Sequence, residues 1–166
     1  MLFRRSRHAR ARVIAPAQRR NRASAAVDRL AQAKRLEAAL VALTRGLHNP
    51  WGESTDDYFQ GFLAPMPAGT ALSAESLRAV LGIGARYQID LAPASDVLAK
   101  LGKTTADRKE DIAGGFRQLA TVMGATLRDL SLAFARGKGV VRVRVWLFGR
   151  TDDGTLVGLR SISTET

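Results

Sequence analysis

The chain has 166 residues and a formal net charge of +11, with 26 lysines and arginines against 15 acidic residues. This length suits one domain with an ordinary core, and no apolar run is long enough to span a bilayer. The absence of cysteine excludes disulfides, thiolate metal sites and a cysteine nucleophile, and it fits a reducing compartment, so we expect a cytoplasmic protein.

The positive charge is concentrated at the N-terminus. Eight of the 26 basic residues fall within residues 1–22, where no acidic residue occurs, so the rest of the chain carries 18 basic and 15 acidic residues. The eight are Arg4, Arg5, Arg7, Arg10, Arg12, Arg19, Arg20 and Arg22. A block of like charge buries too little apolar surface to offset its ordering entropy, so we predict a disordered arm over 1–24 outside a single domain of 25–166. The arm could bind nucleic acid by counterion release, act as an organellar presequence, or have no function.

Helical periodicity begins at about Ser24. Apolar residues recur at three- or four-residue steps through Val27, Leu30, Ala33, Leu36, Leu40, Val41, Leu43 and Leu47. This single stripe predicts an amphipathic helix about six turns long that packs on a sheet and ends before Asn49-Pro50. A coiled-coil partner helix is the alternative, although few heptads are sustained.

Short elements follow the first helix. An aromatic strand is predicted from Tyr58 to Leu63, and a short helix is predicted from a capping Ser73 to Gly82. Alternation then favours a strand from Tyr87 to Leu91.

Two helices are predicted after this strand. Ser95 is expected to cap a short helix that ends at Gly102, and Thr104 with Asp107 imitates a capping box before a long helix that reaches about Leu130.

The C-terminal stretch predicts a long β-hairpin. Val141, Val143, Val145 and Leu147 alternate with Arg142, Arg144, Trp146 and Phe148, so one strand face is apolar and the other begins basic and becomes aromatic. Asp152, Asp153 and Gly154 supply a tight-turn sequence, and a second apolar run follows it through Ile162.

The same stretch resembles a known family. GRTDDGTLVGLRSISTET, residues 149–166, fits the C-terminal signature of the nuclease A inhibitor-like proteins, roughly G-x-T-x-x-G-x-L-x-G-[IL]-x-[ST]-x-x-x-E-T. The matching positions are Gly149, Thr151, Gly154, Leu156, Gly158, Leu159, Ser161, Glu165 and Thr166. The resemblance implies an α+β fold, a three-layer α-β-α sandwich with a small mixed sheet that ends in the hairpin. It also implies a protein that inhibits a sugar-nonspecific, metal-dependent DNA/RNA endonuclease by occupying its active site.

The family also has a loop of the type S-E-S-[DE]-Y-P-F-E after its first helix. Here Ser54, Asp57 and Tyr58 fit this loop within PWGESTDDYFQGFLAP, residues 50–65, and the proline is missing. In the family a loop glutamate reaches the metal site of the nuclease. Strict spacing puts Thr55 at that position, and a shift by two puts Glu53 there, which we slightly favour.

The resemblance implies a set of partner-binding residues. They are Glu53, Ser54, Thr55, Asp57, Thr105, Glu165 and Thr166, of which Glu53 and Thr166 would approach the metal of the partner. Thr105 is included because family members carry contact residues in the loop before the long helix, although this chain has no tryptophan there. The alternative for the first loop is that its hydroxyls and carboxylates only cap a solvated turn.

No catalytic constellation is present in the sequence. His8 and His48 lie in dissimilar surroundings, and no phosphate-binding loop or repeated metal-ligand spacing occurs, so we expect a non-enzymatic protein without cofactor or metal of its own. Two other functions stay open. One is a nucleic-acid-binding module that uses the arm and Arg142, Arg144 and Arg160, and the other is a protein of the same fold with a different partner.

Overall fold

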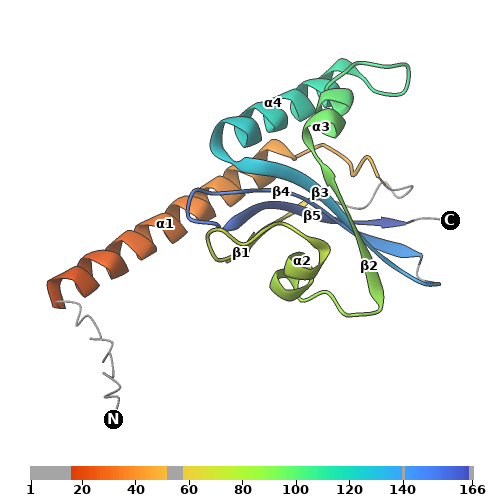
Figure 1. Ribbon diagram of the computed structural model, residues 1–166. Helices are drawn as coiled ribbons and strands as arrows, with labels where there is room; N and C mark the ends of the chain where they lie inside the picture. The colour runs from red at the N-terminus through yellow and green to blue at the C-terminus, as the bar shows by residue number, and fades with distance from the viewer. Residues whose placement is uncertain (1–15, 52–57, 140, 165–166) are drawn as a thin grey trace, which may run out of the picture.

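The computed structural model describes residues 16–51, 58–139 and 141–164 (Figure 1). Within these ranges the elements run in the order α1 (Pro16–Leu43), β1 (Gln60–Ala64), α2 (Ala74–Leu81), β2 (Tyr87–Pro93), α3 (Ser95–Leu101), α4 (Glu110–Thr126), β3 (Arg128–Gly137), β4 (Arg142–Arg150) and β5 (Leu156–Thr164). Neither α1 nor any shorter helix in the described ranges combines the length and the apolarity that a bilayer span needs.

The strands form one sheet of order β1-β5-β4-β3-β2. The α+β class and the hairpin of β4 and β5 are confirmed. The prediction of a mixed sheet is wrong, because all four strand pairings are antiparallel. Two helices, α3 and α4, connect β2 to β3. The chain leaves the sheet after β2 and re-enters it at the same end as β3 (Figure 1).

Strand β3 was missed by the sequence analysis, which extended the long helix to about Leu130. Helix α4 instead ends at Thr126, and Leu127 already has an extended backbone with φ −127°. β3 lies between β2 and β4, and its small residues Ala133 and Ala135 are fully buried. Alanine has a low strand propensity, so local preference did not reveal a strand that is stabilised by packing on both faces.

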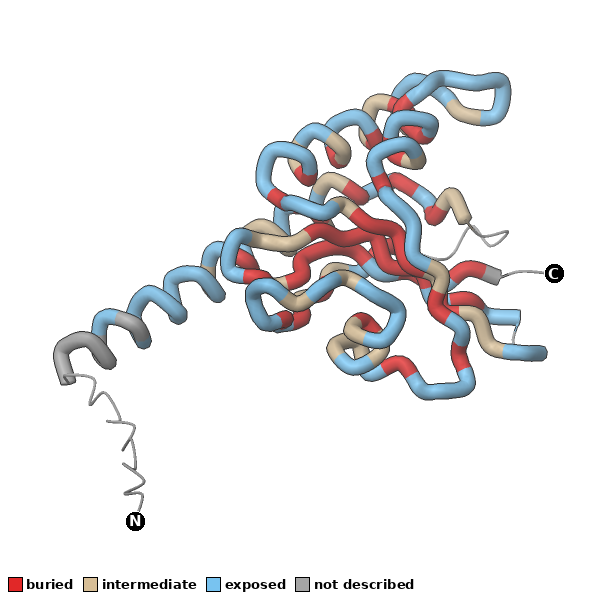
Figure 2. Tube along the Cα trace, in the orientation of Figure 1, coloured by how far each residue is buried: buried red, intermediate tan, exposed pale blue. Residues whose placement is uncertain are grey.

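Helices cover both faces of the sheet, which confirms the predicted three layers (Figure 1). On one face, α1, α3 and α4 pack against residues such as Val145 and Leu147 of β4. On the other, which we call the α2 face, Leu77 of α2 packs in a second cluster with Trp146 and Phe148. The predicted alternation of β4 therefore divides its side chains between two cores, and Figure 2 shows the buried strands between the layers.

Helix α1 differs from its prediction at its N-terminal half. It begins at Pro16, so part of the segment expected as an arm is helical. Its stripe packs only from Ala33 onward, because the preceding turns extend past the sheet (Figure 2). Val27 and Leu30 are 66% and 51% exposed, so their prediction as core residues is wrong.

The capping predictions succeed at α2. Ser73 is its N-cap and forms a capping box with Ser76, and Gly82 ends the helix in the left-handed conformation with φ 63°.

The capping predictions fail at α3 and α4. At α3 the N-cap position is Ala94 and not Ser95, and at α4 it is Lys109, without a side-chain cap at either helix. The hydroxyl of Thr104 donates to Glu110 and does not form a capping box with Asp107.

Candidate functional site

The residues just before the segment 52–57, which lies outside the described residues, are hydrogen-bonded to β5. The Asn49 side-chain amide donates to the carbonyl oxygen of Ile162 at 2.9 Å, and the Ser163 hydroxyl donates to the carbonyl oxygen of Trp51. Asn49 is 3% exposed and Ser163 is fully buried, so both polar groups depend on these hydrogen bonds for their burial. These bonds hold Asn49 and Trp51 against the C-terminal part of β5.

Tyr58, the residue after the same segment, is hydrogen-bonded to the same strand. The Ser161 hydroxyl donates to the carbonyl oxygen of Tyr58 at 3.4 Å, a long bond, and β1 begins two residues later. Trp51 also makes edge-on ring contacts with Phe59 and Phe134, with centroids 6.2 Å apart in each pair. We call Asn49, Trp51, Tyr58, Ser161 and Ser163 the junction.

Most of the predicted site residues lie outside the described residues. These are Glu53, Ser54, Thr55, Asp57, Glu165 and Thr166, together with Arg4, Arg5, Arg7, Arg10 and Arg12 of the arm. Arg19, Arg20 and Arg22 lie in α1, and their side chains are outside the description. For the first loop and the last residues, the structure describes the residues to which they are joined, and these lie together at the end of β5.

Thr105 is described, and it is exposed on the connection between α3 and α4. Its backbone exchanges two hydrogen bonds of 3.1 Å with Arg108. The Arg108 guanidinium donates to the carbonyl oxygen of Lys100 at 3.1 Å, which ties the connection to α3. Thr105 is therefore held by its own loop, and its role in partner binding stays a prediction.

A groove opens on the α2 face of the sheet, with a volume of about 630 Å³. Its walls come from β1, β4, β5 and the end of α2. They include Tyr58, Phe62, Leu81, Arg144, Trp146 and Arg160. Tyr58 is 66% exposed, whereas Trp146 and Phe62 are buried, at 6% and 8%.

The strand register brings two predicted arginines together in this groove. Arg160 is opposite Trp146 and Arg144 is opposite Ile162, so the two arginines are diagonal neighbours on the same face. In the described ranges neither guanidinium has an acidic partner, and that of Arg144 lies 5.4 Å from the ring centroid of Tyr87. Arg142 follows on the same face and is exposed. The groove thus combines an exposed aromatic ring with positive charge that has no acidic partner among the described residues.

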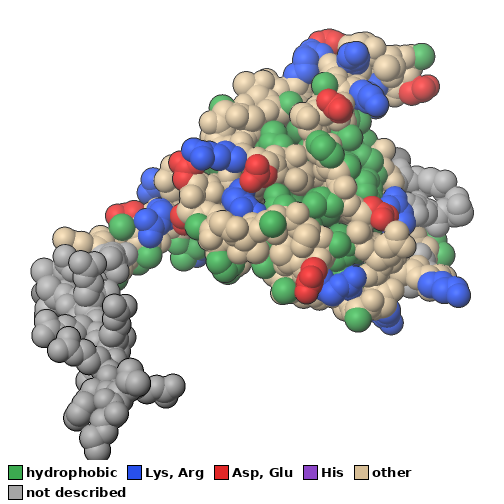
Figure 3. All heavy atoms as spheres, viewed as in Figure 1, with side chains coloured by type: hydrophobic (Ala, Val, Ile, Leu, Met, Phe, Trp, Pro, Cys, Tyr) green, Lys and Arg blue, Asp and Glu red, His purple; other side chains and the backbone are tan. Residues whose placement is uncertain are grey.

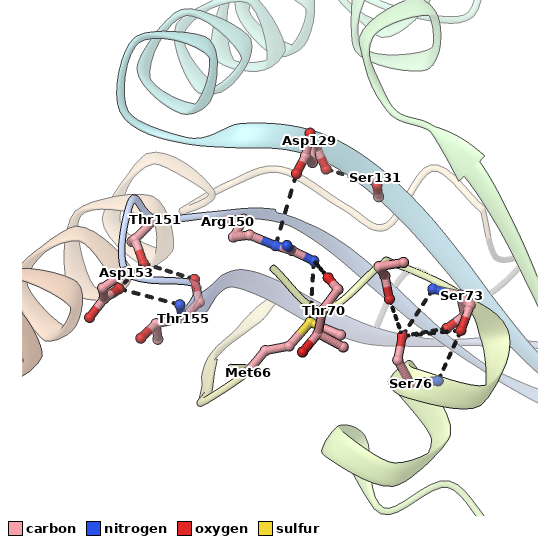
Figure 4. A network of polar contacts seen from close by, with 11 residues as sticks. Met66, Thr70, Ser73, Ser76, Asp129, Ser131, Arg150, Thr151, Asp153 and Thr155 are labelled. Carbon is pink, nitrogen blue, oxygen red and sulfur yellow. Dashed lines mark hydrogen bonds and ion pairs between the residues drawn. The ribbon is translucent and has the colours of Figure 1, made fainter. Parts of the chain in front are cut away.

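A third polar region, around the hairpin turn, stabilises the fold (Figure 4). The Arg150 side chain is 14% exposed and donates to the carbonyl oxygen of Thr70 at 2.8 Å, and its Nε lies 3.9 Å from an Asp129 carboxylate oxygen. A Cβ added to Gly154 would lie 2.5 Å from the carbonyl oxygen of Met66, so the turn is packed closely on that segment. These contacts give the turn a structural role.

The two carboxylates of the turn have separate partners, and Asp153 also lies 3.6 Å from the Arg29 guanidinium of α1. Asp153 accepts a hydrogen bond from the Thr151 hydroxyl at 2.5 Å and a second from the Thr155 amide at 3.3 Å. The Thr151 hydrogen bond is the main cause that lowers the pKa of Asp153 below its ordinary value, against an opposing effect of burial. Asp152 points elsewhere and pairs with Arg128 at 2.9 Å. Asp152 and Asp153 therefore do not form a catalytic dyad.

A lowered pKa also occurs at the start of α4, and it too has a local cause. The Thr104 hydroxyl and the Arg117 guanidinium both donate to Glu110, and these bonds lower the pKa of its carboxyl. Over the described part of the chain, no three histidine or acidic side chains are grouped so as to hold a metal ion.

No protein-family model matches this sequence, and a search of curated proteins finds no match either. The resemblance to the nuclease A inhibitor-like proteins therefore depends on the residues of 50–58 and 149–166 alone.

The sequence does not predict the hydrogen bonds of the junction or the groove, although Tyr58 and Ser161 are matching positions of the family motifs. Asn49 was interpreted only as a helix end, and its bond to β5 spans 113 residues of sequence. The sequence hypothesis of a nucleic-acid-binding module already includes both groove arginines together with Arg142. Their proximity to Tyr58 and Leu81 depends on the β1–β5 register and on the position of α2, which no local pattern encodes.

Proposed function

We propose that this protein inhibits a sugar-nonspecific, metal-dependent DNA/RNA endonuclease by inserting the loop 52–57 and the end of the chain into the nuclease active site. The observation that supports the proposal is the junction. The residues that flank the loop, Asn49 and Trp51 before it and Tyr58 after it, are hydrogen-bonded to β5 near its end. The two segments that the family resemblance assigns to the partner are therefore joined to the described fold at one place.

Attachment at both ends favours tight binding. A loop that is held at its two ends loses less conformational freedom when it docks, and less of the interaction free energy is spent on ordering it. Asn49 and Ser163 are buried, so solvent does not compete for the bonds that hold the first end. Trp51, the residue before the loop, also packs against the hydrophobic core, which restrains that point of the chain.

The chemistry of the proposed contact follows from the metal of the nuclease. Such an enzyme holds a divalent cation that binds a phosphate oxygen of the substrate, and a carboxylate oxygen can take that place. Glu53 is our candidate for this ligand, with Thr55 as the alternative, and Glu165 and Thr166 supply further contacts. We place this activity in the cytoplasm, which suits a chain without cysteine.

The test is a cleavage assay with the cognate nuclease from the same source, into which the full chain is titrated. We expect cleavage to stop at about one inhibitor per nuclease. Glu53→Gln should raise the inhibition constant by more than about tenfold, because an amide is a weaker ligand for a divalent cation and carries no charge. Glu75→Gln is the matched control, since Glu75 is exposed at the start of α2.

Two results would overturn the proposal. One is undiminished cleavage at a stoichiometric excess of the chain over the cognate nuclease. The other is equal inhibition by the parent, by Glu53→Gln and by a variant in which Thr55, Glu165 and Thr166 are also replaced by alanine.

A further inference from the structure

The groove on the α2 face carries positive charge that the described part of the chain does not neutralise. Arg144 and Arg160 are diagonal neighbours on β4 and β5, and like charges at this spacing repel each other. Lys138 and Arg142 extend the positive charge toward the connection from β3 to β4. Figure 3 shows basic side chains at that end of the sheet. A bound anion would relieve this repulsion.

The groove also has apolar and aromatic lining residues. Tyr58 is 66% exposed, Ile162, the register partner of Arg144, is 41% exposed, and Leu81 of α2 contributes to the lining. An exposed aromatic ring beside unpaired arginines is the combination that binds unpaired bases by stacking and the adjoining phosphates by charge. The volume of about 630 Å³ lies within the range of sites for ligands of nucleotide size.

We propose that the groove binds single-stranded nucleic acid, with a base stacked on Tyr58 and phosphates paired with Arg144 and Arg160. A base within a duplex is stacked between its neighbours and cannot enter the groove, so the groove discriminates single strands from duplexes. An arginine-rich arm would not do so, because simple charge attraction favours the higher charge density of a duplex. The site is separate from the arm, and it shares Tyr58 and Ser161 with the junction, so each groove variant is also assayed for nuclease inhibition.

The test measures binding of the full chain to a labelled twelve-nucleotide single strand and to the corresponding duplex, by fluorescence anisotropy over a range of salt. Replacement of both Arg144 and Arg160 by alanine should reduce the salt dependence for the single strand by about 1.4 in slope. It should therefore weaken binding about tenfold near 0.15 M salt. Arg45→Ala, an exposed arginine outside the groove, is the matched control and should change neither quantity.

The aromatic contact is tested separately. Tyr58→Ala should weaken binding of the single strand by about 5- to 150-fold and leave duplex binding unchanged, whereas Tyr58→Phe should keep the parent affinity because it keeps the stacking face. Far-UV circular dichroism verifies that each variant is folded.

Three outcomes would overturn the proposal. The first is an equal single-strand affinity of the parent and the groove variants. The second is a loss of affinity with Arg45→Ala as large as the loss with the groove arginines. The third is displacement of the oligonucleotide by a polyglutamate peptide at a lower concentration than by an unlabelled single strand. The last would identify the groove as a site for an acidic protein segment.

Discussion

Replacement of Gly158 by alanine tests the packing of the hairpin. Gly158 of β5 is paired with Phe148 on one side and with Phe62 on the other, and the two rings meet edge-on across it with centroids 6.2 Å apart. A Cβ at this position would lie 2.6 Å from the Phe148 Cα and 2.7 Å from its Cβ, and closer still to the carbonyl oxygen of Leu147. Most of these atoms belong to the backbone of the neighbouring strand, so relief requires movement of the strands themselves.

The magnitude follows from two effects. Overpacking of a core costs about 1–3 kcal/mol, and loss of an aromatic pair costs about 0.5–1.5 kcal/mol. We therefore expect the free energy of unfolding to fall by about 3 kcal/mol. For a chain of this size that corresponds to a decrease in Tm of about 6–12 °C.

The assay is thermal and urea unfolding followed by far-UV circular dichroism, with Gly124→Ala as the control. Gly124 lies in α4, and a Cβ there would meet nothing within 4 Å, so alanine should stabilise the helix by about 0.5–1 kcal/mol. The two glycine-to-alanine substitutions should thus shift Tm in opposite directions. A Gly158→Ala variant whose Tm stays within about 1 °C of the parent would refute the packing argument.

Two further predictions concern the junction and the turn. Ser163→Ala should lower the free energy of unfolding by about 1–3 kcal/mol because it leaves the Trp51 carbonyl oxygen without this donor, and it should weaken nuclease inhibition. Ser95→Ala, at an exposed serine that caps nothing, should change neither quantity. Equal inhibition by both variants would contradict the role of the junction. The Thr151 hydrogen bond lowers the pKa of Asp153 below its ordinary value of 3.8, so its contribution to stability is present above that value and is lost as pH falls through the lowered pKa. Asp153→Asn should accordingly reduce Tm at about pH 6, and its deficit should begin to shrink only as the pH falls below 3.8 and should disappear below the lowered pKa, whereas a deficit that is constant with pH would be inconsistent with this linkage.

The elements that the sequence predicted well are those whose signals are local. The strand β4 alternates between apolar and polar or aromatic residues, and the turn after it has a glycine at φ 97°, so the hairpin could be derived from spacing alone. Likewise Ser73 and Gly82 mark both ends of α2 by residue type. In each case the side chain or backbone freedom that determines the structure lies within a few residues of it.

The errors have tertiary causes. β3 is stabilised by strands on both sides, and its buried alanines carry little strand preference of their own. In α1 the apolar periodicity continues through Val27 and Leu30, although the sheet does not extend far enough to cover them. A periodic pattern states which face of a helix is apolar, but not whether another element reaches that face.

The glycines of the family signature have structural reasons in this chain, which limits what the signature can say about function. A Cβ at Gly149 would lie 2.6 Å from the Cβ of Leu127, Gly154 requires a positive φ, and Gly158 has no room between its neighbouring strands. Any protein that packs a hairpin in this way needs glycine at these positions, whatever its partner. The signature glycines therefore bear on the fold, while the proposed inhibition depends on Glu53 or Thr55 and on the last two residues. Substitutions in the hairpin would reduce inhibition simply by unfolding the domain, so only substitutions in the loop and at the end of the chain, made in a protein of unchanged Tm, can decide whether it binds a nuclease.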